Sequence, residues 1–384
     1  MSKPSLTSPR TLGSVLVVGG CGFLGHHIVQ ALLSEHKSAS VSVLDVRTDR
    51  NRFPNVAYYS GSIIDTSFVK SILDEIRPRV IIHTASPLAI NNIPKQVFYK
   101  VNVEGTKTLI DCAKACGSVD AFVYTSSASV VHDSASDLRW ATESLPVLLA
   151  PEQPEYYSET KGLADILVLE ANDSKMSTVC IRPSGIFGEG DAQMIPNLLA
   201  TLDAGRVGVQ LGDNKKPFDY TYVGNVADAH ILAAERLIAA KDSPSPNQPK
   251  VAGEAFFVTN DSPLPFWTFA RLVWQAANTF STEQTGKPAS LPTKIRVIPR
   301  PVALALATIM EWVYWIVFFG TKQPTLTRQK AKFVMMERTY CIDKAKERLG
   351  YVPRVSLEEG ARRAVRSARE KGKGSKDGGG KKGE

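Results

Sequence analysis

Cysteine is scarce in this chain, and its few cysteines follow no recognisable pattern. The 384 residues include 5 cysteines, an odd number, with no Cys-x-x-Cys pair among them. Cys112 and Cys116 lie four residues apart in a predicted helix, which is more typical of core packing than of a metal site. The 6 histidines form no His-x-x-x-His pattern. We therefore expect a reducing compartment and no structural metal.

Two further patterns are missing, one for secretion and one for nucleic-acid binding. Residues 1–14 are polar and include two prolines, without the apolar stretch of a signal peptide. The formal net charge is +8, but part of this excess lies in residues 361–384, and no basic stripe with interleaved aromatics occurs. We expect no nucleic-acid partner, a flexible N-terminus at residues 1–13 and a disordered basic tail at residues 366–384. If this tail has a partner, its charge favours an anionic membrane surface.

Near the N-terminus, the sequence predicts a strand, a glycine-rich turn and a helix in succession. Residues 14–19 are an apolar, β-branched run too short for a helix, and an amphipathic helix follows through about Leu33. The turn can be read as G-x-G-x-x-G from Gly20 or as G-x-x-G-x-x-G from Gly19. Such a turn lets the backbone approach a pyrophosphate, which the N–H groups of the helix N-terminus then bind. The residues expected to bind a dinucleotide here are Gly19, Gly20, Cys21, Gly22, Phe23, Leu24 and Gly25.

An acidic residue ends the second predicted strand, residues 41–44. Asp45 follows Gly25 by twenty residues, where a carboxylate can bind the adenosine ribose hydroxyls and would repel a 2′-phosphate. The sequence therefore predicts NAD as the cofactor rather than NADP. Arg47, Arg50 and Arg52 follow closely and would weaken this preference. The alternative role for Asp45 is that of a turn or cap residue.

A Tyr-x-x-x-Lys pair lies in a predicted helix at residues 155–172. Tyr157 and Lys161 are four residues apart, so they share one face of this helix. Tyrosine ordinarily titrates near pH 10, and a neighbouring fixed positive charge lowers that pKa. The pair can therefore move a proton to or from an alcohol or ketone. Tyr156 is no alternative, because Thr160 occupies the position four residues after it.

Together, the glycine turn, the Tyr-Lys pair and a serine pair at residues 126–127 resemble the extended short-chain dehydrogenase/reductase family over about residues 12–365. The resemblance implies an α/β fold with a doubly wound parallel (Rossmann) sheet. It assigns residues 14–190 to an NAD-binding domain, to which residues 224–240 and 255–260 return. Residues 191–223 and 261–365 are expected to form a smaller substrate-binding region. Further strands are predicted at residues 56–59, 80–83, 121–124, 178–182 and 255–259.

The resemblance also assigns roles to individual residues. Ser127 would position the reacting oxygen and Tyr157 would transfer its proton, while Lys161 lowers the tyrosine pKa and binds ribose. Ser126 and Ser129 are expected only to satisfy backbone groups at the strand end. Asn102, in the segment N-V-x-G-T, would have a structural or proton-relay role. The cofactor-binding residues implied beyond the glycine turn and Asp45 are Ile64, Asp65, Thr84, Ala85, Ser86, Asn102, Tyr157, Lys161, Pro183 and Ile186; Ser62 replaces an aspartate of the family pattern.

Residues 219–226 and 258–267 resemble the 3β-hydroxysteroid dehydrogenase branch, and most closely its decarboxylating sterol-4α-carboxylate 3-dehydrogenases. This resemblance implies NAD-dependent oxidation of the 3β-hydroxyl of a 4α-carboxysterol, with loss of the carboxylate as CO2 during sterol C4 demethylation. Alternatives are a 3β-hydroxysteroid dehydrogenase/isomerase, another oxidoreductase or epimerase of the same scaffold, and a non-catalytic cofactor-binding scaffold. For the C4 carboxylate, Lys215 and Lys216 are candidates by charge alone. The implied partners are a sterol C4 oxidase, a 3-keto reductase and a second copy of the chain.

Residues 302–319 form an apolar stretch with one charge, Glu311. As a helix it would be roughly 27 Å long, marginal for crossing a bilayer. Three interpretations are contact with one leaflet, a complete span, and a buried core or dimer helix. The first is favoured, because a span would separate residues 340–353, which resemble the closing element of the substrate region, from the sheet. Trp312, Tyr314 and Trp315 suit a membrane interface, and we expect the endoplasmic reticulum membrane with the catalytic part in the cytosol.

Overall fold

The computed structural model describes residues 12–35, 37–87, 93–286, 294–319 and 321–377. Its centre is a seven-stranded sheet in the order β12-β7-β5-β4-β1-β2-β3, with every neighbouring pair parallel. The order reverses between β1 and β4, so the predicted doubly wound sheet is confirmed, and the crevice beyond this point is where such sheets bind ligands. The strands are β1 (Ser14–Val18), β2 (Ser40–Asp45), β3 (Ala57–Ser60), β4 (Val80–His83), β5 (Ala121–Thr125), β7 (Ser177–Pro183) and β12 (Glu254–Val258).

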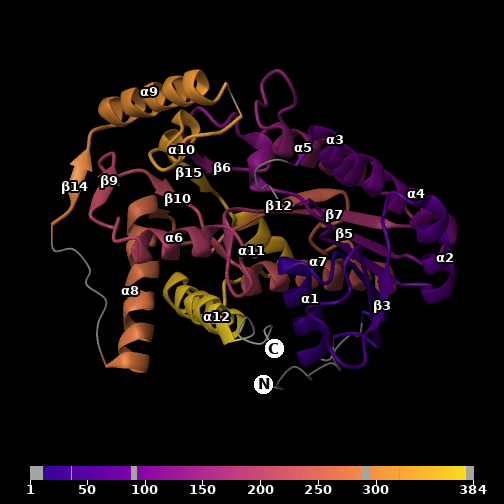
Figure 1. Ribbon diagram of the computed structural model, residues 1–384. Helices are drawn as coiled ribbons and strands as arrows, with labels where there is room; N and C mark the ends of the chain where they lie inside the picture. The colour runs from indigo at the N-terminus through magenta and orange to yellow at the C-terminus, as the bar shows by residue number, and fades with distance from the viewer. Residues whose placement is uncertain (1–11, 36, 88–92, 287–293, 320, 378–384) are drawn as a thin grey trace, which may run out of the picture.

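Helices cover both faces of this sheet (Figure 1). In β1, Val15 and Val17 belong to one buried cluster, and Leu16 and Val18 to the other, because successive strand residues point to opposite faces. One face packs against α1 (Phe23–Ser34) and α7 (Val223–Asp242). The other packs against α2 (Thr66–Ile76), α4 (Thr106–Cys116) and α5 (Tyr156–Glu170), with α3 (Lys95–Phe98) and the π-helical η1 (Tyr99–Gly105) beside α5.

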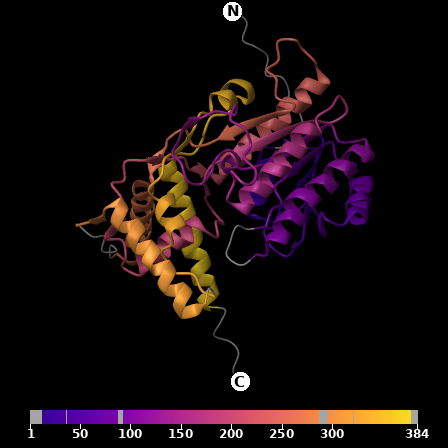
Figure 2. The ribbon, with the colours of Figure 1, turned by 90° about the horizontal axis from the view of Figure 1, so that it is seen from above.

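A second, smaller sheet lies beyond the carboxyl edge of the first (Figure 2). Its order is β13-β10-β15-β6, from Leu264–Pro265, Pro217–Phe218, Arg338–Tyr340 and Leu138–Ala141. Strand β6 was assigned to the first domain by sequence, but it pairs with β15, about two hundred residues later in the chain. The remaining described elements are β8 (Ile186–Phe187), β11 (Thr221–Tyr222), β9 (Val209–Leu211), β14 (Arg296–Ile298), α6 (Met194–Asp203), α8 (Phe266–Thr285), α9 (Arg300–Phe318), α10 (Arg328–Phe333), α11 (Asp343–Leu349), α12 (Leu357–Asp377) and, after β5, the 3-10 helix η2 (Ala128–Val131).

Both expected terminal segments contain ordered residues. Leu12 is buried and donates its N–H to the carbonyl of Lys37, so the flexible N-terminus does not include residues 12 and 13. The predicted disordered tail is wrong for residues 366–377, which continue α12. One face of this helix packs into the core through Ala364 and Val365, and Arg369 forms an ion pair with Asp203 of α6 at 2.6 Å. Residues 1–11 and 378–384 lie outside the described residues.

Candidate active site

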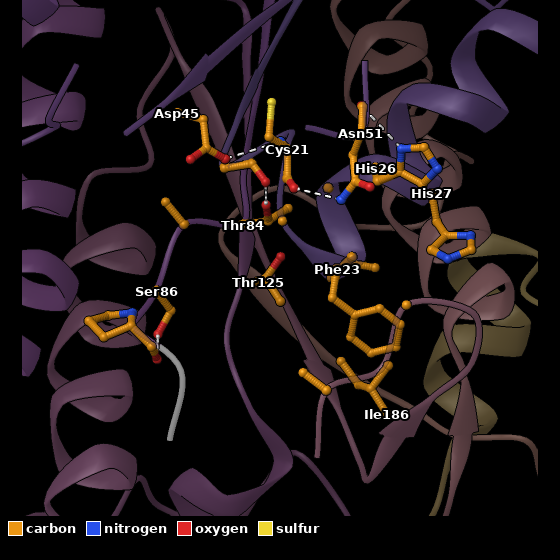
Figure 3. Close-up of a pocket in the computed structure, with 18 of the residues that line it drawn as sticks. Cys21, Phe23, His26, His27, Asp45, Asn51, Thr84, Ser86, Thr125 and Ile186 are labelled. Carbon is orange, nitrogen blue, oxygen red and sulfur yellow. Dashed lines mark hydrogen bonds between the residues drawn. The ribbon is translucent and has the colours of Figure 1, made fainter. Parts of the chain in front are cut away.

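A cavity of about 1190 Å³ lies at the carboxyl edge of the seven-stranded sheet. It extends from the glycine turn and Asp45 past the end of β4 to the Tyr157 face of α5, and the C-terminal helix α12 also borders it. Figure 3 shows Cys21, Thr84 and Thr125 near the middle of this space, with Phe23 on one side of them and Ser86 on the other. The cavity therefore joins the predicted cofactor and catalytic residues in one continuous space.

The glycine turn leaves no room for side chains at two positions. Gly19 has φ +83°, and a Cβ there would lie 2.7 Å from the backbone N of Ala85. A Cβ on Gly25 would lie 2.2 Å from the carbonyl oxygen of Gly19. The bare backbone and the start of α1 at Phe23 thus form a cradle suited to a pyrophosphate. Gly20 does not line the cavity; a Cβ there would meet Val43 at 2.7 Å, so this glycine permits packing on β2 rather than ligand contact.

Asp45 both fixes the glycine turn and faces the cavity. Its Oδ2 accepts the N–H of Cys21 at 3.0 Å, and its Oδ1 accepts the N–H of Arg47 at 3.0 Å. The cap role and the ribose-binding role are therefore compatible. Of the three neighbouring arginines, Arg50 lines the cavity, whereas Arg52 lies over the ring of Tyr58 at 4.5 Å.

Residues after β3 and β4 form the next wall. Thr84, Ala85 and Ser86 line the cavity, and the Thr84 hydroxyl donates to the carbonyl of Val18 at 2.9 Å. Ile64 and Asp65 do not line it, contrary to the expectation from the family motif; Gly61, Ser62 and Ile63 do. Asp65 instead caps α2, accepting the N–H of Phe68 at 3.0 Å.

Asn102 is buried in η1 behind α5 and does not line the cavity. Its Nδ2 donates to the Thr160 hydroxyl at 3.0 Å, while Oδ1 has no hydrogen-bond partner among the described residues. The expected cofactor contact is therefore absent from this arrangement. The sequence also allowed a structural role for Asn102, and its hydrogen bond to Thr160 fits that role because the bond braces η1 against α5.

The three residues assigned to catalysis all line the cavity. Tyr157 and Lys161 lie one turn apart on α5, and Ser127 follows β5. Lys161 is 2% exposed; its ammonium donates to the Thr125 carbonyl and lies 4.3 Å from the ring centre of Tyr124. Pro183 and Ile186, at the end of β7 and in β8, also line this part of the cavity.

The electrostatics of the Tyr-Lys pair differ from the expected pattern. Burial lowers the pKa of Lys161 to about 7, although Cys180 and Asp165 oppose this shift. Burial raises the pKa of Tyr157 above its ordinary value of 10.0, and a hydrogen bond from Ser86 acts in the other direction. The expectation that the Lys161 charge lowers the Tyr157 pKa is therefore wrong for this arrangement, in which burial has the larger effect. The physical reason is that the amino group binds the carbonyl at the end of β5 and is itself poorly solvated.

The hydroxyl of Ser127 belongs to a short chain of serines. Its Oγ lies 2.8 Å from Oγ of Ser129, which in turn accepts the Ser158 hydroxyl at 2.8 Å. Ser129 thus does more than the backbone role expected for it, because it links Ser127 to α5 next to Tyr157. Ser126 lines the cavity, and its N–H donates to the Ile181 carbonyl at 2.7 Å.

The sequence interpretation missed several residues of this site. Asp165, one turn after Lys161, is fully buried and forms two hydrogen bonds with Arg182 of β7, at 2.9 and 2.7 Å. Only the pairing of α5 with β7 reveals this brace, although the spacing from Lys161 indicates a shared face. Lys215 and Lys216 do not line the cavity, and Lys216 is paired with Asp137. Cavity residues without a motif include Gln30, Asn51, Thr125, Glu189, Asp191, Gln193, Met194, and the α1 and α12 residues His26, His27, Ser367 and Lys371.

The lowered pKa of Lys161 predicts a pH-dependent stability. Between about pH 7 and its ordinary value of 10.5, an unfolded chain protonates Lys161 more fully than the folded one, so the unfolding free energy rises with pH. We expect wild type to gain stability relative to Lys161→Met as the pH increases across this window. Urea unfolding of both proteins at about pH 7 and about pH 9.5 measures it. A difference that stays constant with pH would contradict the buried, poorly solvated amine.

Comparison with known proteins places this geometry in a family. Residues 16–289 match the model of the 3-beta hydroxysteroid dehydrogenase/isomerase family. A Saccharomyces cerevisiae protein named sterol-4-alpha-carboxylate 3-dehydrogenase, decarboxylating, is 37% identical over 92% of this chain and 97% of its own length. Its Homo sapiens namesake is 34% identical over 92% of this chain and 87% of its own.

Solved structures agree on the fold. A UDP-glucose 4-epimerase of Thermotoga maritima, solved with UDP-glucose, superposes with a TM-score of 0.66 at 20% identity, covering 93% of this chain and 99% of that one. The Bordetella bronchiseptica enzyme WbmH, in complex with NAD+, gives 0.66 at 17% identity, covering 93% and 98%. Likeness at this level of identity concerns the fold, whereas the family model and the sequence relatives concern descent. By that evidence, the chain belongs to the 3-beta hydroxysteroid dehydrogenase/isomerase family.

Proposed function

We propose that this protein oxidises the 3β-hydroxyl of a 4α-carboxysterol with NAD and releases the C4 carboxylate as CO2. The observation that carries the proposal is the meeting of Ser127, Tyr157 and Lys161 in one cavity with the glycine cradle. Relatives that are 37% and 34% identical over 92% of this chain bear the name of this reaction. The reaction belongs to sterol C4 demethylation.

The residues divide the chemistry among them. The cradle at Gly19 and Gly25 would hold the pyrophosphate, and the bound nicotinamide would accept hydride from C3. Tyr157 takes the hydroxyl proton as its phenolate, a step for which its raised pKa must fall once cofactor and sterol are bound, and Ser127 holds the reacting oxygen beside it. The Ser129–Ser158 chain in turn holds the Ser127 hydroxyl in place. The product is a β-keto acid, whose C4–carboxylate bond breaks because its electron pair enters an enolate at the C3 oxygen.

Asp45 supports NAD as the partner rather than NADP. Its carboxylate lines the cavity and stays in place through hydrogen bonds from Cys21 and Arg47. A 2′-phosphate beside this fixed negative charge would be repelled, and ribose hydroxyls would be bound. Arg50 is the one nearby arginine that lines the cavity, so it alone could soften the preference.

The test uses the purified protein, NAD and two sterols that differ only in the 4α-carboxylate. NADH formation and CO2 release from the carboxysterol, at matched rates, are the expected result. NADH without CO2 would indicate a plain 3β-hydroxysteroid dehydrogenase. Binding of NAD without turnover of either sterol would refute the substrate and favour a scaffold role.

We further propose that α9 contacts one leaflet of the endoplasmic reticulum membrane. Trp312, Trp315 and Ile316 are 61%, 62% and 61% exposed, an unusual outward display of apolar side chains. Among the described residues, α9 is the helix long and apolar enough to cross a membrane. Yet Ala303 and Ala307 are fully buried in a cluster with Ala331 of α10, contacts that a spanning helix would lose.

Charge and connectivity support a helix lying along the membrane. Glu311 accepts the side chain of Arg328 at 2.6 Å and its backbone N–H at 2.8 Å, which ties the middle of α9 to the start of α10. The strands on either side, β14 and β15, pair with β9 and β6 of the same body. Figure 1 shows α9 along the outer edge of the molecule, above α10. A sterol dissolved in the bilayer would then reach a catalytic part that faces the cytosol.

Membrane residence would also bring the partners of the pathway together. The carboxylate must be made by a sterol C4 oxidase, and the 3-ketone must be reduced afterwards. We propose that both enzymes share the membrane with this protein, and that the protein itself forms a homodimer. Co-purification from detergent-solubilised membranes and the mass of the purified protein would test these two points.

Replacing Trp312 and Trp315 together with Glu should reduce binding to phospholipid vesicles by at least about tenfold, because both indole rings would leave the interface. Vesicle flotation of the full chain measures the bound fraction. Val352→Glu is the control, since Val352 is 67% exposed but lies outside α9. Equal vesicle binding by the double variant, or a shift from dimer to monomer instead, would contradict the membrane role.

A further inference from the structure

The C-terminal helix α12 reaches the cavity beside the glycine cradle. Ser367 and Lys371, one helical turn apart, both line it. A Cβ built on Gly190 would lie 3.7 Å from the ring of Phe23 and 3.9 Å from the Lys371 ammonium. The ammonium therefore lies beside the side chain of Phe23, the first residue of α1. Figure 1 shows this end of α12 next to α1.

Core packing and one ion pair hold α12 in this position. Ala361, Ala364 and Val365 are buried in the main core cluster. Arg369 binds both carboxylate oxygens of Asp203, at 2.8 and 2.6 Å. Lys371 therefore lies two residues after an anchored position, Arg369, on a helix that packs into the core. Its place near the cavity does not depend on a long loop.

The cavity lining is short of positive charge at the cradle. Arg50 lies with Asp45 at one end, and Lys161 lies at the catalytic end. His26 and His27 border the cradle (Figure 3), but burial lowers the pKa of each below 6.5, so both are neutral at pH 7. Lys371 is thus the cation available to two phosphates at this point of the lining.

Lys371 also has no ion-pair partner within the described part of the chain. One carboxylate that lines the same pocket is Glu189, whose Oε1 accepts the Tyr222 hydroxyl at 2.9 Å and whose Oε2 has no partner among the described residues. The pocket lined by both residues therefore holds the Lys371 ammonium, which has no ion-pair partner among the described residues, and the Glu189 Oε2, which has no hydrogen-bond partner among them. A diphosphate would bind the Lys371 ammonium, and the Glu189 carboxylate would compete with it for that ammonium.

We propose that Lys371 of the C-terminal helix binds the pyrophosphate of the dinucleotide, closing the cradle from the side opposite the glycine turn. This inference rests on the proposed function only in requiring a dinucleotide cofactor. It makes α12, which is remote in sequence from the Rossmann motif, part of the cofactor site. Cofactor binding should accordingly steady the last turns of α12.

The test compares ligands that do and do not carry the diphosphate. Lys371→Ala should raise the dissociation constants of NADH and ADP about tenfold, as expected for one charge-assisted hydrogen bond, and leave adenosine unchanged. Lys371→Arg should retain most of the affinity. Arg362→Ala is the matched control: it removes a cation from the same helix, where Arg362 pairs with Glu359 at 2.8 Å and does not line the cavity.

Hydrogen exchange gives a second readout that does not depend on turnover. NADH should slow amide exchange in residues 366–371 of wild type, but much less in Lys371→Ala. Unchanged NADH affinity in that variant would overturn the inference, as would an equal loss of adenosine affinity. If Glu189→Gln reproduced the loss seen in Lys371→Ala, a Lys371–Glu189 pair would replace the phosphate contact. If wild type and Lys371→Ala bind NADH with the same affinity, only this inference is refuted. If wild type binds no NADH, the proposed function is refuted as well.

Discussion

Sterol oxidation by Tyr157→Phe should fall about a hundred- to ten-thousand-fold, the usual contribution of a positioned acid or base. The substitution removes one oxygen from a half-buried ring whose hydroxyl receives a hydrogen bond from Ser86. The ring itself keeps its packing against Phe98, at 6.0 Å between centres. NADH affinity should therefore remain within about twofold, and the loss should appear in kcat.

Tyr156→Phe is the matched control for this experiment. Tyr156 precedes Tyr157 in the same helix, does not line the cavity, and has the Lys95 ammonium 5.2 Å from its ring centre. We expect this variant to retain wild-type turnover. Full turnover by Tyr157→Phe would remove the tyrosine from the chemistry and support a role for another proton donor. Loss of NADH binding in Tyr157→Phe would instead indicate a structural defect.

The second large effect concerns the brace beneath the catalytic helix. Asp165→Ala should lower the free energy of unfolding by about 3–5 kcal/mol, because it leaves the Arg182 guanidinium buried without its carboxylate. The side chains of Arg182 and Asp165 are 4% and 0% exposed, so water cannot take over the lost bonds. Urea unfolding monitored by far-ultraviolet circular dichroism measures the change.

A double variant distinguishes the buried charge from the lost packing. Asp165→Leu combined with Arg182→Met replaces the ion pair with apolar volume and should recover most of the stability lost in Asp165→Ala. If the double variant is instead less stable than either single one, the two side chains contribute independently. Because Asp165 lies one turn after Lys161, we also expect Asp165→Ala to reduce kcat where the protein remains folded.

Local patterns carried the predictions that proved accurate. The glycine turn is specified by contacts within a few residues, such as the 3.0 Å bond from the Gly22 N–H to the Gly19 carbonyl. The shared face of Tyr157 and Lys161 follows from helical periodicity alone. Alternating strands and helices likewise implied the parallel sheet. Each of these signals lies within a short window of sequence.

Residues adjacent to those motifs were less predictable. Asp65 lies in a family motif beside the adenine, yet it caps α2 because the N–H of Phe68 is within 3.0 Å of its carboxylate. Asn102 points away from the cavity toward Thr160. The Lys161 amino group binds the carbonyl at the end of β5. In each case a nearby backbone or hydroxyl group competes with the ligand for the side chain, and sequence spacing does not reveal the competitor.

By itself, the sequence determined the fold class, the glycine turn and the helix that carries Tyr157 and Lys161, because each depends on periodicity or on glycine at set intervals. The tertiary structure decided what lies around them. The composition of α12 is that of a solvated tail, yet a few apolar residues on one face pack it into the core and bring Lys371 to the cradle. Strand β6 joins β15 across about two hundred residues. Such contacts depend on which surfaces meet after the chain folds, and no local pattern encodes that meeting.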